Sequence, residues 1–334
     1  MDWKLLEELT QAWGVSGRED AVRAIIAREA APYADEMITD ALHSLIVFKR
    51  GTGGGKKIML AAHMDEIGLQ VTKVDPDGKL RVRQVGWIWP GSLYNDKVRF
   101  RGGTVGIVGC DGPIEQVGRE IPKLFIDIGC TSKEQAEKYV KVGDMCGFIG
   151  AYHELPEGRI TAKSLDDRIG CLLLEALKQN RGDLPHDVYY VFSTQEEIGC
   201  RGAQAAAQRI LPDVGLSVDI APDHAYPCDL TGSNTVGAGV AIAFGDPDSM
   251  PDEDVVNTLV ACCEENGIPY QRDVIDRGGT DAGAINLAGA GVRTGAIAVV
   301  TRYPHCQSCM LAKADAEGAL LLIDLFCRRP LNFC

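Results

Sequence analysis

The feature that most constrains the fold is a regular alternation of apolar strands and helices in the C-terminal half of the chain. Nearly continuous apolar runs predict buried strands at 188–194, 215–220, 239–244 and 296–301. Helical patterns lie between and around these strands, at 165–178, 202–209, 252–266, 280–288 and 314–327. This alternation is typical of an α/β fold with a mainly parallel sheet and helices on both faces.

Two helices are expected at the N-terminus. Apolar residues at helical spacing predict them at 3–13 and 19–31. Ser16 and Glu19, three residues apart, have the spacing of a capping box at the start of the second helix.

Strands at 44–49 and 57–62 follow, joined by the glycine-rich segment 51–56. The segment lacks the full phosphate-loop motif and no helix follows it, so a phosphate-binding role is excluded. We expect a hairpin turn there.

The pattern changes between residues 71 and 161. Turn signals recur at short spacing, and short runs rich in Val, Ile and Arg separate them, with one helical pattern near 132–140. We therefore expect an inserted, mostly β domain at 71–161. The α/β domain is then discontinuous and comprises 1–70 and 162–334.

Composition excludes several classes of protein. The 334 residues include 34 Lys and Arg and 47 Asp and Glu, a net charge of −13 that argues against nucleic-acid binding. No apolar run is long enough to span a membrane and the N-terminus does not resemble a signal peptide, so we expect a cytoplasmic protein without a membrane partner. The 12 scattered cysteines are then expected to be reduced.

Side chains that bind metals occur at five places, four of them at predicted strand ends and one at a predicted helix start. They are His63 with Asp65, Asp166 with Asp167, Glu196 with Glu197, Asp219, and His305. Sites in open α/β sheets form at the carboxyl ends of strands, so these side chains are expected to meet at one edge of the sheet.

Two imidazoles and several carboxylates suit Zn, Co or Mn better than Ca or Mg, which prefer oxygen ligands. Two histidines cannot complete one tetrahedral site with so many acids left over. A pair of ions can use all these ligands, with one Asp bridging them. We expect two divalent ions, Zn or Co, with Mn as an alternative.

Neighbouring acids can divide the work at such a site. His63 and Asp65 share a face of a regular strand, so Asp65 can accept a hydrogen bond from the second ring nitrogen of the histidine. One of Glu196 and Glu197 can bind metal while the other acts as general base for a water molecule.

Each of these residues also fits a structural role when taken alone. Asp166 and Asp167 can complement a helix dipole, and on a helix they point about 100° apart, so at most one of them faces the site. The occurrence of all these side chains at sheet termini is what favours a metal site.

Five segments together resemble the cytosolic dinuclear metallo-aminopeptidases of the tetrahedral, glutamyl and deblocking aminopeptidase type, a family in which some members are named endoglucanase. The resemblance covers essentially the whole chain, in order. The segments are 14–20 (GVSGRED), 62–68 (AHMDEIG), 162–170 (AKSLDDRIG), 194–199 (TQEEIG) and 279–283 (GTDAG).

The resemblance implies a role for each residue. One metal site would use His63, Asp166 and Asp219, and the other Asp166, Glu197 and His305, with Asp166 bridging. Glu196 would be the general base and Asp65 the partner of His63. Gly279, Thr280 and Asp281 are expected at the substrate rim, although a tight turn before a helix would explain this segment equally well.

The implied activity is removal of N-terminal residues from short peptides, by a hydroxide that forms when the two metals activate a water molecule and Glu196 takes its proton. In the family an inserted β domain serves dimerisation, which agrees with the insert expected at 71–161. Dimers of family members commonly form a tetrahedral dodecamer.

One segment departs from the family pattern. Relatives usually follow the last histidine ligand with a small hydroxyl residue and a proline, whereas here His305 is followed by Cys306. The change creates a Cys306-x-x-Cys309 pair, which fits a redox pair, a soft metal clip or incidental thiols.

Two other functions compete with peptide hydrolysis. A glycoside hydrolase needs two carboxylates flanking a glycosidic bond and, commonly, aromatic platforms for sugars. Trp87 and Trp89 are candidates for a platform but fall in the expected insert. A non-catalytic binding or assembly protein on the same scaffold is the other alternative.

Overall fold

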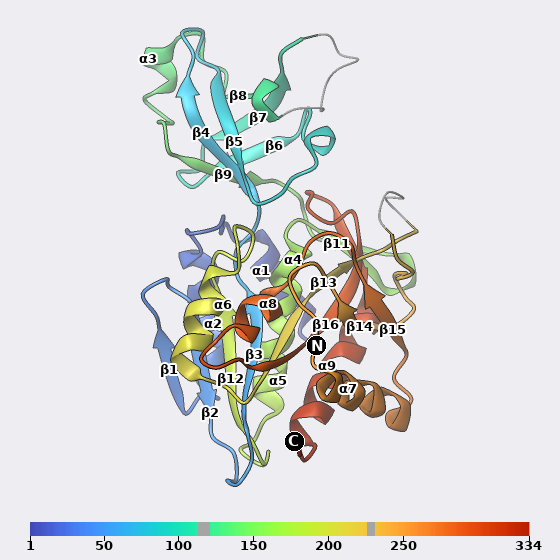
Figure 1. Cartoon of the computed structure of the whole chain (residues 1–334). Helices are drawn as coiled ribbons and strands as arrows, with labels where there is room; N and C mark the ends of the chain where they lie inside the picture. The colour runs from blue at the N-terminus through green and yellow to red at the C-terminus, as the bar shows by residue number, and fades with distance from the viewer. Residues whose placement is uncertain (113–120, 226–230, 334) are drawn as a thin grey trace.

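The computed structural model describes residues 1–112, 121–225 and 231–333 (Figure 1). A large mixed sheet with helices on both faces forms the lower part of the molecule in Figure 1, and a small barrel stands above it.

The α-helices in these ranges match the predicted positions, apart from the interruption near residue 166 described below. They are α1 (Trp3–Gln11), α2 (Asp20–Ala30), α3 (Lys133–Ala136), α4 (Leu165–Arg168), α5 (Leu172–Gln179), α6 (Arg201–Ile210), α7 (Glu253–Asn266), α8 (Asp281–Asn286) and α9 (Lys313–Arg328).

The large sheet has eleven strands in the described ranges. They are β1 (Glu36–Thr39), β2 (Leu45–Lys49), β3 (Lys57–His63), β10 (His153–Leu155), β11 (Arg159–Ala162), β12 (Asp187–Ser193), β13 (Val214–Pro222), β14 (Val240–Gly245), β15 (Tyr270–Val274), β16 (Arg293–Arg302) and β17 (Cys309–Ala312).

The sheet is mixed, with parallel pairs at its centre and between β14 and β15, which corrects the expectation of a mainly parallel sheet. The strands β12, β3, β13 and β16 lie side by side in parallel, whereas β2 joins β12 and β17 joins β16 antiparallel. The connections β1–β2, β10–β11 and β16–β17 are too short for a helical crossover, so these strands pair antiparallel.

The expected hairpin at 51–56 is also wrong. The strands β2 and β3 are not neighbours, because β12 lies between them and pairs with both. The glycine-rich segment therefore connects two strands of the sheet that are separated by a third.

Two apolar layers bury the faces of the sheet. One joins the sheet to α1, α2, α5, α7 and α9 through side chains such as Leu6, Ile26 and Phe326. The other packs the alanines of α6 and Ile285 of α8 against Met59 and Val191. Burial on both faces explains why the central strands have nearly continuous apolar sequences.

The barrel is closed and antiparallel, with strand order β4-β5-β8-β7-β6-β9. Its strands are β4 (Gly68–Val74), β5 (Leu80–Val85), β6 (Lys97–Phe100), β7 (Val105–Cys110), β8 (Leu124–Asp127) and β9 (Met145–Phe148). It has its own apolar core around Leu69, Leu80 and Ile126. The barrel strands thus begin at Gly68 and end at Phe148, before residue 161, because β10 and β11 pair in the large sheet.

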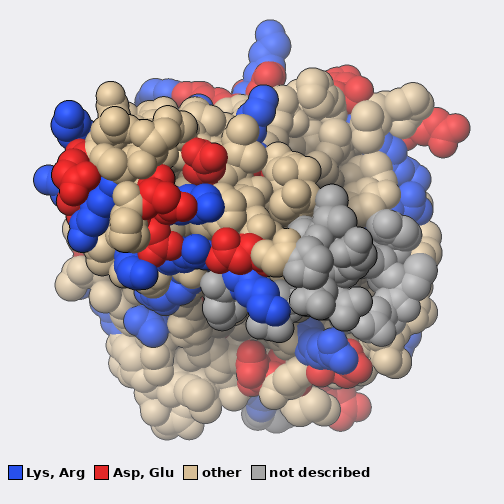
Figure 2. Space-filling view, turned by 90° about the horizontal axis from the view of Figure 1, so that it is seen from above, with Lys and Arg blue, Asp and Glu red and all other residues tan. Residues whose placement is uncertain are grey.

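Charges of both signs are mixed on the barrel. Asp75 pairs with both Lys73 and Arg81, and Lys79 pairs with Asp77. Figure 2, which views the molecule from the barrel end, shows Lys and Arg side chains interspersed with Asp and Glu. Among the described residues, the helices are too short or too polar to cross a membrane.

Candidate active site

The predicted metal-binding side chains meet beside the barrel, at one edge of the large sheet. His63 ends β3, Asp219 lies on β13, and Glu196 and Glu197 lie in the loop after β12. Asp166 comes from α4 and His305 from the turn between β16 and β17. The convergence of strand ends at one edge follows from the parallel centre of the sheet.

His63 is buried against the carboxylates. Its Nε2 lies 3.1 Å from Asp166 Oδ1, 3.8 Å from Glu196 Oε2 and 4.0 Å from Asp219 Oδ1. On the other side of the ring, Nδ1 lies 3.4 Å from Asp65 Oδ1. Nε2 therefore faces the acids while Asp65 faces the opposite nitrogen, the arrangement usual for a histidine that binds a metal.

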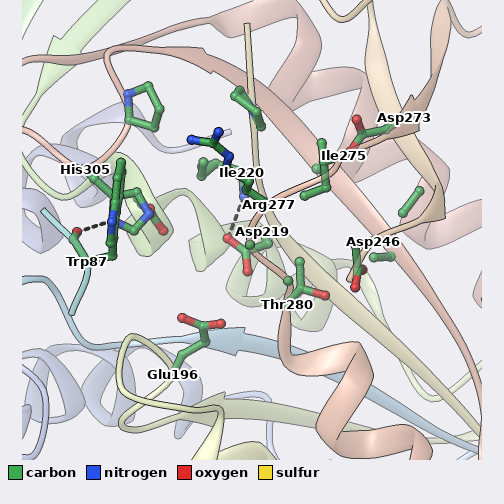
Figure 3. A pocket seen from close by; sticks show the side chains of 18 of the residues that line it. Trp87, Glu196, Asp219, Ile220, Asp246, Asp273, Ile275, Arg277, Thr280 and His305 are labelled. Atoms are coloured by element: carbon green, nitrogen blue, oxygen red, sulfur yellow. Dashed lines mark hydrogen bonds and ion pairs between the residues drawn. The ribbon is translucent and has the colours of Figure 1, made fainter. Parts of the chain in front are cut away.

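His305 approaches the same aspartate from the opposite side. Its Nε2 lies 3.3 Å from Asp166 Oδ2 and its Nδ1 lies 3.7 Å from Glu197 Oε2. Nδ1 also lies 2.7 Å from the carbonyl oxygen of Trp87 (Figure 3). The two oxygens of Asp166 thus face different imidazoles, as a bridging carboxylate requires.

The acids of the cluster are held at an electrostatic cost. Burial, and then the nearby Asp166, raise the pKa of Asp219 to about 8, against the effect of His63. Burial and neighbouring acids also raise the pKa of Glu197 well above its usual range. Acids in such a cluster repel one another unless cations lie between them.

The donor set fits divalent metal ions. Ligand atoms of His63, Asp166 and Glu197 all lie within 4.8 Å of one another, and so do those of His63, Asp167 and Asp219. Asp167 also has a buried carboxylate oxygen without a hydrogen-bond partner in the described part of the chain. Imidazole combined with carboxylate is the ligand chemistry of Zn, Co and Mn.

The backbone at Asp166 and Asp167 differs from the predicted continuous helix at 165–178. Both residues have non-helical backbone angles, and the helix is divided into α4, a 3-10 turn (Ile169–Cys171) and α5. Because this segment is not a regular helix, both acids lie at His63, and the expectation that at most one of them faces the site is wrong. Asp167 Oδ2 instead accepts a hydrogen bond from the backbone amide of His63.

The expected capping box is also wrong, and its residues belong to the site. The Ser16 hydroxyl donates to Asp65 Oδ2 over 2.5 Å, and Glu19 accepts hydrogen bonds from the amides of Gly17 and Gln195. The helix α2 begins after Glu19 without a side-chain cap. The family motif at 14–20 was the signal that could have placed these residues at the site.

Asp65 holds the two glutamates in place. It accepts hydrogen bonds from the backbone amides of Glu196 and Glu197, at 3.0 and 3.3 Å. Because it also faces His63, Asp65 connects β3 to the loop after β12.

A buried ion-pair network lies behind Asp166, and its residues were not predicted. Lys163 Nζ donates to Glu66 Oε2 over 2.6 Å, and Arg168 lies 3.6 Å from the other oxygen of Glu66. Arg168 also donates to carbonyl groups at the end of α1, those of Leu9 and Ala12. The network joins the segment around Asp166 to the N-terminal helix.

A cavity of about 440 Å³ opens from the cluster (Figure 3). Gly279 and Thr280 line it, as do Trp87 and Trp89, which reach it from the segment after β5. Asp281 is buried next to Glu196 instead, and one of its oxygens accepts a hydrogen bond from the Ser193 hydroxyl.

The two cysteines after His305 differ in their surroundings. The Cys306 thiol donates to the carbonyl of Tyr303, whereas Cys309 is buried on β17. Both are free thiols.

Comparison with known proteins identifies the family. The family model of the M42 glutamyl aminopeptidases matches residues 43–322. The chain belongs to this family.

Relatives of this M42 peptidase match it over nearly its full length. A putative aminopeptidase of Acetivibrio thermocellus is 36% identical and the match covers 97% of this chain and 98% of the relative. The solved structure of an aminopeptidase from the archaeon Desulfurococcus kamchatkensis has a TM-score of 0.92 at 35% identity and covers 97% of this chain and 94% of its own.

A further solved structure is similar to the M42 peptidase and shows an assembly. The TET1 peptidase of Pyrococcus horikoshii, which can assemble into a tetrahedron or a large octahedral shell, has a TM-score of 0.88 at 32% identity and covers 97% of this chain and 98% of its own. These matches show that the chain is a peptidase of the aminopeptidase type.

Proposed function

We propose that this M42 peptidase removes N-terminal residues from short peptides and depends on two divalent cations, Zn or Co, with Mn as an alternative. The observation that carries the proposal is the position of Asp166, whose two oxygens face His63 and His305 at 3.1 and 3.3 Å. Such a carboxylate between two imidazoles is suited to bridging two ions.

The residues would divide into two ligand sets around the bridging aspartate. His63 and Asp219 would complete one set, and Glu197 and His305 the other. When bound, two such ions polarise a peptide carbonyl group and lower the pKa of a water molecule.

Glu196 is proposed as the general base. Its Oε2 lies 3.8 Å from His63 Nε2, and its Oε1 accepts a hydrogen bond from the Cys200 thiol. Burial and the acids around it raise the pKa of Glu196 well above the usual range, which increases the affinity of its carboxylate for a proton. It would take the proton at its carboxylate from the attacking water and give it to the leaving amine.

The substrate would lie in the cavity beside the cluster. Its free amino group carries a positive charge that buried acids attract, which favours cleavage at the N-terminus. Gly279 and Thr280 are proposed to contact the bound peptide, because both line the cavity. Asp281 is proposed to act with them from its buried position beside Glu196.

The test is metal removal and replacement with a matched pair of substrates. Dialysis against a chelator should abolish hydrolysis of leucine p-nitroanilide, and Zn, Co or Mn should restore it. N-acetyl-leucine p-nitroanilide, which lacks the free amino group, should not be cleaved. A glycoside hydrolase that works through two carboxylates keeps its turnover without metal, so chelator-resistant glucan hydrolysis would replace this proposal.

We also propose that the chain self-associates into dimers through a barrel domain and that dimers build a dodecamer. The barrel exposes Val105 and Ile107, with 47% and 48% of their surface accessible, on the same side of β7. Apolar side chains exposed in this way are common at contacts between subunits. Light scattering should give twelve times the mass of the 36.0 kDa chain, and charged substitutions at Val105 and Ile107 should reduce it.

A further inference from the structure

The cavity continues past the cluster along the large sheet. Small residues alternate along two adjacent strands there, Ala243 and Gly245 on β14 and Ala296 and Ala298 on β16, and all four line the cavity. Alternate positions on a strand point to the same face. These small side chains leave that face hollow, with room for a substrate side chain.

Two carboxylates stand at the far end of this space. Figure 3 shows Asp246 and Asp273 on the opposite side of the cavity from His305. Asp246 follows β14 directly, and Asp273 lies on β15 opposite Ala243. Neither belongs to the groups of ligand atoms around His63.

Asp246 is held rigidly in place. Its Oδ1 accepts hydrogen bonds from the backbone amides of Asp248 and Ser249, and its Oδ2 accepts one from the Ser249 hydroxyl. The carboxylate is therefore fixed before any substrate arrives.

Asp273 has capacity to bind a further donor. Its residue surface is 6% accessible, and its Oδ1 accepts a hydrogen bond from Asn234 over 2.6 Å. Its Oδ2 accepts none from the described part of the chain. Burial raises the pKa of Asp273, and the charge of Asp246 raises it further. The hydrogen bond from Asn234 and the charge of His224 act against this shift. A cation between the two acids would relieve their repulsion.

The walls between the cluster and these acids are largely apolar. Ile220, Pro222 and Ile275 line them. The opposite charge in the cavity lining is Arg277, which is exposed to solvent. An apolar passage that ends in carboxylates matches a side chain with an apolar stem and a cationic end.

We infer that this cavity binds the side chain of a basic N-terminal residue, lysine or arginine, with the stem along the apolar walls and the charge at Asp246 and Asp273. The inference rests on the proposed aminopeptidase function and specifies its substrate.

The test compares lysine with norleucine, which has the same carbon stem without the ammonium group. The kcat/KM for lysine p-nitroanilide should exceed that for norleucine p-nitroanilide by about 10- to 100-fold, the range for hydrogen bonds to a charged group. Equal turnover of the two substrates would overturn the inference. Preference for glutamate p-nitroanilide would also overturn it and would assign specificity to Arg277.

Variants locate the effect. D246N and D273N keep an oxygen acceptor for the hydrogen bonds to the Ser249 amide and to Asn234, and each should lower the lysine-to-norleucine ratio about tenfold. The matched control is D276N, which removes the same charge from an exposed residue outside the cavity lining. An unchanged ratio in both cavity variants, or the same fall in the control, would overturn the inference.

Binding without turnover separates this inference from the proposed function. Calorimetry should show free L-lysine binding about 10- to 100-fold more tightly than L-norleucine to the metal-loaded protein. If no aminoacyl substrate is cleaved, the proposed function fails, and the calorimetric ratio still decides whether the cavity selects a basic side chain. Equal binding of the two amino acids would overturn the inference even where peptides are cleaved.

Discussion

The two halves of the cluster around Asp166 are built differently. His63 ends a central strand, and its side chain is 2% accessible. His305 lies in a turn with a left-handed backbone (φ 54°), and its side chain is 25% accessible. The same aspartate therefore faces one imidazole fixed by the sheet and another carried by a turn.

The partners of the two histidines differ in the same way. His63 faces Asp65, whose Oδ2 in turn accepts a hydrogen bond from Ser16, so these supports come from the segment directly after β3 and the segment before α2. His305 faces the carbonyl of Trp87, which belongs to the segment after barrel strand β5. The position of the second histidine thus depends on how the barrel sits on the sheet, whereas that of the first does not.

The largest effect is expected at Glu196, the proposed general base, which belongs to neither of the proposed ligand sets. Glu196→Gln should lower kcat by roughly 10²- to 10⁴-fold because the proton of the attacking water has no acceptor. Both metal ions should remain, as measured by elemental analysis after dialysis. Loss of either ion would show that Glu196 is a ligand, and near-normal kcat would remove it from the role of base.

The next effect separates the halves directly. Asp65→Asn should weaken the binding of one metal ion about 10- to 100-fold, as is usual when the partner of a histidine ligand is removed. Stepwise metal titration by calorimetry should show the larger loss at the site of His63 and a smaller loss at the other, because Asp65 also accepts a hydrogen bond from the backbone amide of Glu197. Ser16→Ala is the matched control: it removes only the hydrogen bond to Asp65 Oδ2, so a smaller loss is expected. Equal weakening of both ions would contradict the division into halves.

Much of the His63 half could be predicted because strand ends are visible in sequence. Apolar runs mark β3 and β12, and the acids and histidine directly after them necessarily lie at the sheet edge. The order of the strands could not be predicted, since pairing such as β2 with β12 joins segments that are distant in the chain.

The His305 half was less predictable because its contacts come from another part of the fold. Nothing local to Trp87 indicates that its carbonyl reaches His305. The non-helical backbone at Asp166 interrupts a pattern that is helical by its apolar spacing. The short strand β15 was missed for a related reason: only Asp273 of its five residues is buried, so it shows no apolar run, and the acid at the end of the cavity was missed with it.

A change beside the His63 half should alter stability without weakening metal binding. Burial, and then the charge of Asp65, raises the pKa of Glu19 from 4.5 to about 7. The folded protein therefore binds more protons than the unfolded chain between these values, and the stability that this provides is lost as the pH rises through 7.

Glu19→Gln removes this titration while keeping an oxygen for the amides of Gly17 and Gln195. Urea unfolding gives the free energy of unfolding of the variant minus that of the wild type. This difference should be about 2 kcal/mol larger, in favour of the variant, at pH 8 than at pH 4.5. The same difference at both pH values would mean that Glu19 is not the titrating group.

The smallest effect is expected in the His305 half. The Trp87 ring packs edge-on against the imidazole of His305 with their centroids 5.7 Å apart, while its backbone carbonyl faces Nδ1. Trp87→Ala keeps the carbonyl and removes the ring contact, which is worth about 0.5–1.5 kcal/mol. One metal ion should therefore bind about 2- to 10-fold more weakly in the stepwise titration, and Trp89→Ala, which removes a ring in contact with Trp87, should have less effect. If Trp87→Ala and Asp65→Asn mainly weaken the binding of the same ion, the two histidines do not define separate halves. The barrel and the sheet would then support one common site.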